Sequence, residues 1–189
     1  MIKIDHFNVL GPVYDLIFRE KQGHKLQELT DVRPGQKLLD VGGGTGRVSI
    51  LFKDINRALI VADSAQKMLH KALEKGIDSV NSESERLPFH DGAFERIIMV
   101  DALHHVANQQ QTLKEMWRLL APMGKIVIEE PDIRNLIVKL LALGEKLLLM
   151  RSRFLSPERV ASIAEKFPNN NVKIDREKGI AWITITKEK

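Results

Sequence analysis

Cysteine is absent from this chain of 189 residues, and its absence excludes several kinds of chemistry at once. Without thiols there are no disulfides, no thiolate zinc sites, no paired-cysteine redox centre and no cysteine nucleophile. The sequence also lacks internal repeats and low-complexity tracts. With 43% hydrophobic and 29% charged residues it has the composition of an ordinary globular protein, and its length predicts a single domain over residues 1–189.

The chain also has no large excess of basic or acidic residues. The 29 basic and 25 acidic residues leave a net charge of +4, and the basic residues are scattered along the chain. We therefore expect no nucleic-acid partner. The longest apolar stretch, residues 136–150, is interrupted by Lys139, Glu145 and Lys146 and is too short for a membrane span. The N-terminus has no signal-peptide pattern, so a cytoplasmic protein without stable membrane insertion is expected.

Apolar runs of strand length alternate with helical patterns, which indicates a parallel sheet with helices on both faces. The expected parallel strands are Lys37–Val41, Ala58–Asp63, Asp78–Ser82, Phe94–Val100 and Lys125–Glu129. The expected helices are Val13–Leu29, Arg47–Phe52, Ala65–Lys75, Gln109–Leu120, Ile133–Arg151 and one that opens at Ser156. Two last runs, Val172–Arg176 and Ile180–Thr186, are joined by a gap so short that they must pair as antiparallel strands. The sequence therefore predicts an α/β fold of five parallel strands with an antiparallel hairpin at one edge.

A glycine-rich turn follows the first expected strand. It contains Gly42, Gly43, Gly44 and Gly46, and Asp63 closes the second expected strand. In neighbouring parallel strands this arrangement puts a carboxylate beside a bare backbone loop, where a ligand can approach closely and a ribose can donate two hydroxyls. The pair predicts a site for a nucleoside-containing cofactor, with a turn that binds no ligand as the alternative.

The spacing of these glycines argues against a dinucleotide. A dinucleotide turn has the pattern Gly-x-Gly-x-x-Gly, in which the third glycine lets the helix pack close to a pyrophosphate. That third position is Arg47 when counted from Gly42 and Ser49 when counted from Gly44. A cofactor made of a nucleoside and an amino-acid tail needs only the turn. An NAD-linked oxidoreductase is the weaker alternative, because no substrate domain for one is recognisable.

Together with the stretches downstream, the turn resembles the first motif of class I S-adenosylmethionine (SAM) dependent methyltransferases. The resemblance continues through Asp63–Leu69, Glu83–Phe89, Asp91–Phe94, Asp101–Val106 and Trp117–Pro122 and covers about residues 35–130. The chain is most similar to the branch that includes ubiquinone and menaquinone methyltransferases, and residues 7–15 resemble the N-terminal cap of that branch. It departs from the family where Glu83 and Glu95 replace the usual aspartates and Met123 replaces a glycine.

The resemblance implies a seven-stranded, Rossmann-like methyltransferase sheet that binds SAM and releases S-adenosylhomocysteine (SAH). It implies that Asp40 faces the methionine amino group of SAM; the alternative is a carboxylate that only satisfies amides of the turn. The four glycines of the turn would line the methionine and ribose. Asp63 would accept the ribose hydroxyls, with Ser64 beside it, and Glu83 and Ser84 would contact the adenine edge.

Candidate catalytic residues follow the fourth expected strand. Methyl transfer is an in-line displacement that needs alignment and, for hydroxyl or carbon nucleophiles, a base. Asp101, His104 and His105 lie where ligands bind in such sheets, and Asp101 is also a cofactor-binding candidate. Tyr14 would close over the methionine end of SAM from the N-terminal cap. A structural or packing role is the alternative for all four, and the histidines show no metal-ligand spacing.

Two helical additions complete the expected architecture, a cap over residues 1–34 and a lid segment over residues 132–168. Within the lid segment, residues 136–150 are too apolar for an ordinary surface helix. Burial beneath the cap, contact between two copies in a homodimer and the lining of an apolar acceptor pocket are the three alternatives. We predict a SAM-dependent methyltransferase for a small-molecule acceptor, apolar or quinone-like. The alternative is a non-catalytic SAM-binding or partner-binding protein with the same fold.

Overall fold

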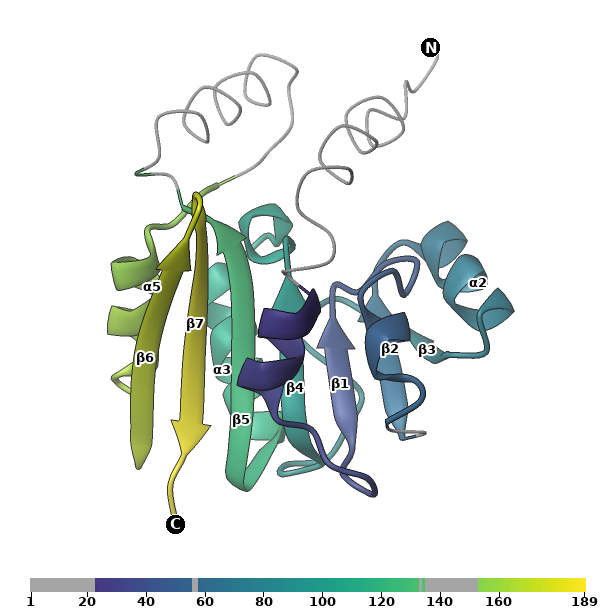
Figure 1. Ribbon diagram of the computed structural model, residues 1–189, viewed down its shortest axis with the longest axis horizontal. Helices are drawn as coiled ribbons and strands as arrows, with labels where there is room; N and C mark the ends of the chain where they lie inside the picture. Colours follow the sequence, from purple (N-terminus) through teal and green to yellow (C-terminus); the bar gives the residue numbers. More distant parts are fainter. Residues whose placement is uncertain (1–22, 56–57, 133, 135–152) are drawn as a thin grey trace.

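A sheet of seven strands forms the centre of the computed structural model, which describes residues 23–55, 58–132, 134 and 153–189 (Figure 1). The strands are β1 (Leu38–Val41), β2 (Leu59–Asp63), β3 (Asp78–Asn81), β4 (Phe94–Val100), β5 (Leu120–Pro131), β6 (Asn170–Glu177) and β7 (Ile180–Lys187). Their order across the sheet is β3-β2-β1-β4-β5-β7-β6. Strands β1 to β5 pair in parallel, and β7 runs antiparallel to both β5 and β6. The predicted sheet is confirmed.

Helices accompany the strands of the sheet. They are α2 (Gln66–Glu74), α3 (Gln109–Leu119) and α5 (Pro157–Ala164), with the short 3-10 helices η1 (Ser49–Phe52) and η2 (Leu103–His105); residues 23–30 are also helical. Helix α5 begins at the predicted cap, where Ser156 Oγ accepts the backbone N–H of Arg159 at 3.2 Å. None of the helices in these described ranges is long and apolar enough to cross a bilayer.

The prediction of a helix over Arg47–Phe52 is wrong in type and extent. The structure has the four-residue helix η1 instead, with tight bonds such as Leu51 N–H to Val48 O at 3.0 Å. Its first flanking residue, Val48, has no side-chain oxygen to accept a free N–H of the first turn. After the glycine turn the chain therefore forms only a short 3-10 helix.

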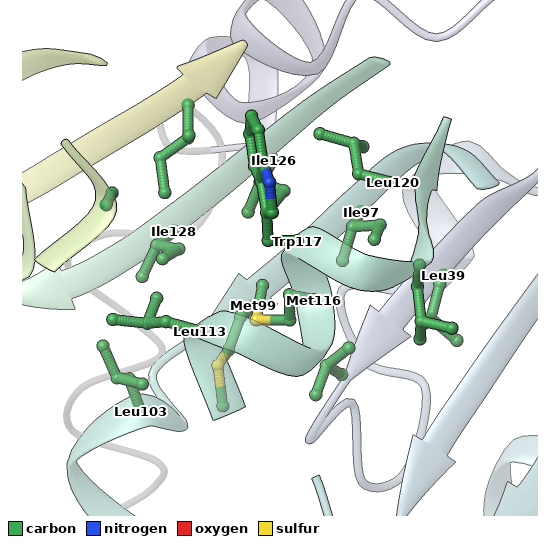
Figure 2. Close-up of a cluster of buried hydrophobic side chains, with 14 of the residues drawn as sticks. Leu39, Ile97, Met99, Leu103, Leu113, Met116, Trp117, Leu120, Ile126 and Ile128 are labelled. Carbon is green, nitrogen blue, oxygen red and sulfur yellow. The ribbon is translucent and has the colours of Figure 1, made fainter. Parts of the chain in front are cut away.

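The larger hydrophobic core lies between the sheet and α3, with α5 at its edge. Leu113, Met116 and Trp117 of α3 pack in one cluster with Ile97 of β4 and Ile126 of β5 (Figure 2). Leu113 and Met116 are fully buried, and burial of side chains of this size contributes about 1.5–3 kcal/mol each. This core holds β4 and β5 in place, and three of the candidate catalytic residues follow the end of β4.

A second core covers the opposite face of the sheet. Leu26 of the helical residues 23–30, Phe52 of η1 and Leu69 of α2 pack there with Ile98 of β4 and Trp182 of β7. In Figure 1 residues 23–30 lie in front of the sheet and α3 lies behind it. Helices therefore cover both faces, and the carboxyl ends of the parallel strands form the edge at which ligands bind in such folds.

The departures at Glu95 and Met123 lie at the start of strands, away from that edge. Glu95 Oε2 accepts the backbone N–H of Lys37 at 2.7 Å and so joins the beginnings of β4 and β1. Met123 has a backbone φ of 63° and is 59% exposed, in a region that favours glycine. Both residues therefore affect packing and backbone strain rather than the candidate site.

Candidate cofactor and acceptor site

The glycine turn lies where the order of the sheet changes direction. Strand β1 has β2 on one side and β4 on the other, so the chain runs outward in both directions from this point. In open α/β sheets, the crevice at such a switch point is where ligands bind, outside the carboxyl ends of the strands. Gly42 N–H donates to Ala62 O at 2.7 Å, which ties the start of the turn to β2.

Close packing explains why glycine occupies the first two positions of the turn. A Cβ on Gly43 would stand 2.5 Å from Asp40 Cγ, and a Cβ on Gly42 would stand 2.7 Å from Ala102 Cβ. Gly42 also has a φ of 73°, in the left-handed region. The turn is therefore pressed against the end of β1 on one side and against the loop after β4 on the other.

Asp40 is a buried carboxylate directly before the turn, with only 1% of its surface exposed. Its Oδ2 accepts a hydrogen bond from Ser49 Oγ, and its Oδ1 is buried and has no hydrogen-bond partner among the described residues. Burial raises the pKa of Asp40 to about 6, and the negative charge of Asp63 adds to this, while Ser49 and Arg47 act against it. An unsatisfied buried acceptor of this kind fits a cationic donor such as the ammonium group of SAM.

Asp63 joins the end of β2 to the glycine turn. Its Oδ2 accepts the N–H of Gly44 at 2.9 Å, and its Oδ1 accepts the N–H of Ala65 at 2.7 Å. Each carboxylate oxygen can accept a second bond, so the group can also receive ribose hydroxyls. Ser64 follows it, and the Ser64 carbonyl accepts Asn81 Nδ2 at 3.0 Å. The structure thus brings Asp40, Asp63 and the turn together at the carboxyl ends of β1 and β2.

The two predicted adenine contacts lie in the turn after β3. Glu83 is exposed, and its carbonyl accepts the N–H of Arg86 at 3.1 Å. Ser84 Oγ lies 3.1 Å from Thr112 Oγ1 of α3 and donates to Glu85 Oε2 at 3.2 Å. The hydroxyl of Ser84 therefore faces α3, while the carboxylate of Glu83 reaches solvent. Their contact with adenine stays a prediction.

The loop after β4 carries three of the four catalytic candidates. Asp101 has a φ of 53°, which is rare for a residue with a side chain, and its N–H donates to Glu129 O at 2.9 Å. The His104 ring is buried between Phe154, with ring centres 4.3 Å apart, and His105, with ring centres 3.9 Å apart. Desolvation of the His105 ring and the neighbouring His104 lower the pKa of His105 to about 4, so it is neutral at pH 7.

Glu130 holds this loop in place, and it is a residue that the sequence did not identify. Its Oε1 accepts the N–H groups of Ala102 at 3.0 Å and Leu103 at 2.8 Å, and its Oε2 lies 2.6 Å from His104 Nδ1. An ionised carboxylate only accepts, so the pairing places a proton on His104 Nδ1. The Glu-Glu-Pro sequence directly after an apolar strand was the available signal.

Several predictions fall outside the described residues. Tyr14, most of the cap over residues 1–34 and the apolar residues 136–150 belong to this group. Their roles over the methionine end, as a lid or in a homodimer therefore stay predictions. In the part of the chain that the structure describes, no group of three or more histidine or acidic side chains is arranged to hold a metal ion.

The α/β fold, with a glycine turn and two carboxylates at the carboxyl edge of its sheet, suits a nucleoside-containing cofactor. Comparison with known proteins narrows this class, because residues 39–128 match the family model described as a methyltransferase domain. Residues 39–128 are therefore similar to a methyltransferase domain, the seven-stranded sheet has the fold of a solved SAM-dependent methyltransferase, and SAM is the cofactor that this similarity supports. The buried Asp40 oxygen and the side-chain-free turn fit this cofactor.

Among curated proteins, the chain is similar to the ubiquinone/menaquinone biosynthesis C-methyltransferase UbiE of Ectopseudomonas mendocina. The two are 31% identical over 142 residues, which is 66% of this chain and 56% of the relative. The chain thus spans little more than half the length of that enzyme. Among solved structures, a SAM-dependent methyltransferase from Thermotoga maritima has 20% identity and a TM-score of 0.79, with 97% of each chain covered. The [4+2]-cyclase SpnF has 17% identity and a TM-score of 0.72, with 89% of this chain and 81% of the cyclase covered.

Proposed function

We propose that this protein transfers the methyl group of SAM to carbon of a small, quinol-like aromatic acceptor. The arrangement that carries the proposal is the pair of carboxylates, Asp40 and Asp63, on either side of a turn whose first two glycines have no room for a Cβ. The acceptor class is supported by the similarity to UbiE, whose name gives ubiquinone and menaquinone biosynthesis and C-methylation.

The residues of the crevice would hold the cofactor at both ends of its polar part. Asp63 would accept the ribose hydroxyls while it keeps its bond to Gly44 N–H. Asp40 would pair its buried Oδ1 with the ammonium group, which replaces an unsatisfied acceptor by a charge-assisted bond. SAM supplies an electrophilic methyl group on a sulfonium centre. The protein contributes alignment of that centre with the acceptor and the exclusion of water.

Binding of the cofactor is tested by thermal stability. SAH at a hundredfold excess over its dissociation constant should stabilise the protein by about 2.7 kcal/mol and raise its melting temperature. NADH is the matched control, because it carries a pyrophosphate that the turn is not built to receive. A rise with NADH and none with SAH would contradict the assignment of the crevice.

Turnover needs a separate test, because one fold hosts many activities. SpnF, named as a [4+2]-cyclase, shares this architecture. The protein should transfer the methyl group of methyl-labelled SAM to the organic-soluble fraction of a cell extract and to 1,4-naphthoquinol as a defined probe. SAH binding without transfer to any fraction would favour the alternative of a non-catalytic SAM-binding protein.

A further inference from the structure

Glu129 is a buried carboxyl group at the carboxyl end of β5 that the cofactor site leaves unused. It pairs in register with Val100 of β4, and its carbonyl accepts the N–H of Asp101 at 2.9 Å. Glu129 therefore lies one strand beyond Asp101, and neighbouring strands are about 4.8 Å apart. It is buried, with 8% of its surface exposed.

The layout of the proposed cofactor contacts points to this position. The predicted adenine contact follows β3, the ribose contact ends β2 and the ammonium contact ends β1, so the cofactor would run across the edge towards β4. The acceptor must approach the methyl group from beyond the methionine end, because a displacement is in line. The next strands in that direction are β4 and β5, whose ends carry Asp101 and Glu129.

Glu129 differs from its neighbour Glu130 in the hydrogen bonds that its carboxylate accepts. Side chains alternate along a strand, so the two point to opposite faces of the sheet. Glu130 accepts two backbone N–H groups and pairs with His104, which accounts for its carboxylate. Within the described residues, the one donor to the Glu129 carboxylate is Trp182 Nε1 of β7, at 3.1 Å. One hydrogen bond thus orients the Glu129 carboxyl, and its other acceptor positions are not used by the described residues.

The charges around Glu129 set its proton affinity. Burial is the largest effect and raises the pKa of Glu129 to about 7. The charge of Asp101 after β4 and that of Glu130 on β5 act in the same direction, whereas the Trp182 bond and the charge of Arg47 after the glycine turn lower the pKa. A carboxyl with this pKa exchanges a proton near neutral pH, as a general base must.

We propose that Glu129 is the general base of the methyl transfer and that Trp182 is its positioning residue. In the step, the acceptor atom forms its bond to the methyl carbon while the sulfur–methyl bond breaks and its electron pair stays on sulfur. The proton lost by the acceptor goes to the Glu129 carboxylate. This inference rests on the proposed function, because it needs an acceptor that is methylated.

The test compares Glu129→Gln, Asp101→Asn and Trp182→Phe with the wild type. Glu177→Gln, an exposed carboxyl on β6, is the control variant. Transfer of labelled methyl into the cell-extract fraction should rise with pH through about 7 for the wild type and fall at least a hundredfold in Glu129→Gln. SAH affinity should stay within threefold of the wild type in that variant. In Trp182→Phe the loss of the donor should move the rising limb upward by roughly 0.5–1 pH unit.

The possible outcomes distinguish the assignment of Glu129 as general base from the proposed function. If the wild type transfers methyl and Glu129→Gln keeps the same rate, the assignment of Glu129 is wrong and the function stands. If the rise of the rate with pH is lost only in Asp101→Asn, the general base is Asp101. A wild type that binds SAH and never transfers methyl overturns the proposed function and the base with it. If Glu129→Gln does not fold, a pH dependence of the transfer rate in Trp182→Phe equal to that of the wild type overturns the assignment of Glu129.

The titration of Glu129 can also be tested without any acceptor. The melting temperature of Glu129→Gln should rise above that of the wild type from pH 5 to 8, and equal melting temperatures over this range would contradict the titration.

Discussion

The carboxyl edge of the sheet has two halves that are built in different ways. At β1 and β2 the site is made of backbone and two carboxylates, within the 24 residues from Asp40 to Asp63. At β4 and β5 it is made of side chains that are distant in sequence, such as His104 with Glu130 and Glu129 with Trp182, which is 53 residues further along the chain. The first half forms around a turn, whereas the second exists only once the sheet is complete.

The difference matches the two tasks of a group-transfer enzyme. A shared cofactor requires the same contacts in every relative, and a short glycine turn with a carboxylate supplies them locally. An acceptor differs from one enzyme to the next, and residues from separate strands can be exchanged without loss of the cofactor site. Substitutions in the two halves should therefore have separable effects on stability and on SAH binding.

The largest effect is expected for Glu130→Ala. The change removes the acceptor for two backbone N–H groups and for His104 Nδ1, all of them buried. Each buried donor left without an acceptor costs about 1–3 kcal/mol, so chemical denaturation should show a loss of about 3 kcal/mol or more. Glu130→Gln keeps an oxygen for the two amides and should lose less. Equal stability of Glu130→Ala and the wild type would show that this half does not depend on the carboxylate.

In the half at β1 and β2, Asp40→Asn should stabilise the fold at pH 7 and weaken the binding of SAM. The pKa of Asp40 is about 6 in the folded protein and 3.8 ordinarily, so the folded state binds the proton more tightly. Stability is therefore lost as pH rises from about 3.8 to 6, by up to about 3 kcal/mol. The asparagine cannot ionise, so the variant should be more stable than the wild type at pH 7 and similar to it near pH 4, in urea unfolding.

The same variant should bind SAM more weakly at pH 7, because the ammonium group loses its carboxylate partner. Calorimetry with SAH measures this loss. A variant that gains stability and keeps full affinity would remove Asp40 from the site and leave it a purely structural carboxyl, which would weaken the contrast between the two halves.

Asp63→Ala should affect binding more than folding. It removes the acceptor of Gly44 N–H and the proposed partner of the ribose hydroxyls. We expect the SAH dissociation constant to rise at least tenfold, about 1.4 kcal/mol. Glu95→Ala is a suitable comparison, because Glu95 accepts the N–H of Lys37 at 2.7 Å and lies at the opposite end of the sheet from the cofactor contacts. Unchanged SAH affinity in Asp63→Ala would contradict the assignment of the ribose contact.

The sequence allowed prediction of the first half but not of the second. The parallel strands, the hairpin and the pairing of the glycine turn with Asp63 follow from apolar periodicity, turn chemistry and short spacing. The sequence marks His104 as a candidate, but its partner Glu130 is 26 residues away on another strand. Glu129 and Trp182 meet only because β7 inserts between β5 and β6. Contacts made by strand order leave no local pattern to recognise.

The smallest predicted effect concerns a residue in neither half. Met123 adopts a φ of 63° at the start of β5, where glycine would avoid the crowding of a Cβ. Met123→Gly should therefore stabilise the fold by about 0.5–1 kcal/mol, since the strain removed exceeds the added freedom of the unfolded chain. Thermal unfolding measures the gain, and SAH affinity should not change, because the residue lies at the opposite end of the sheet. A change in affinity would show that the cofactor half responds to global stability, and the separation of the two halves would then fail.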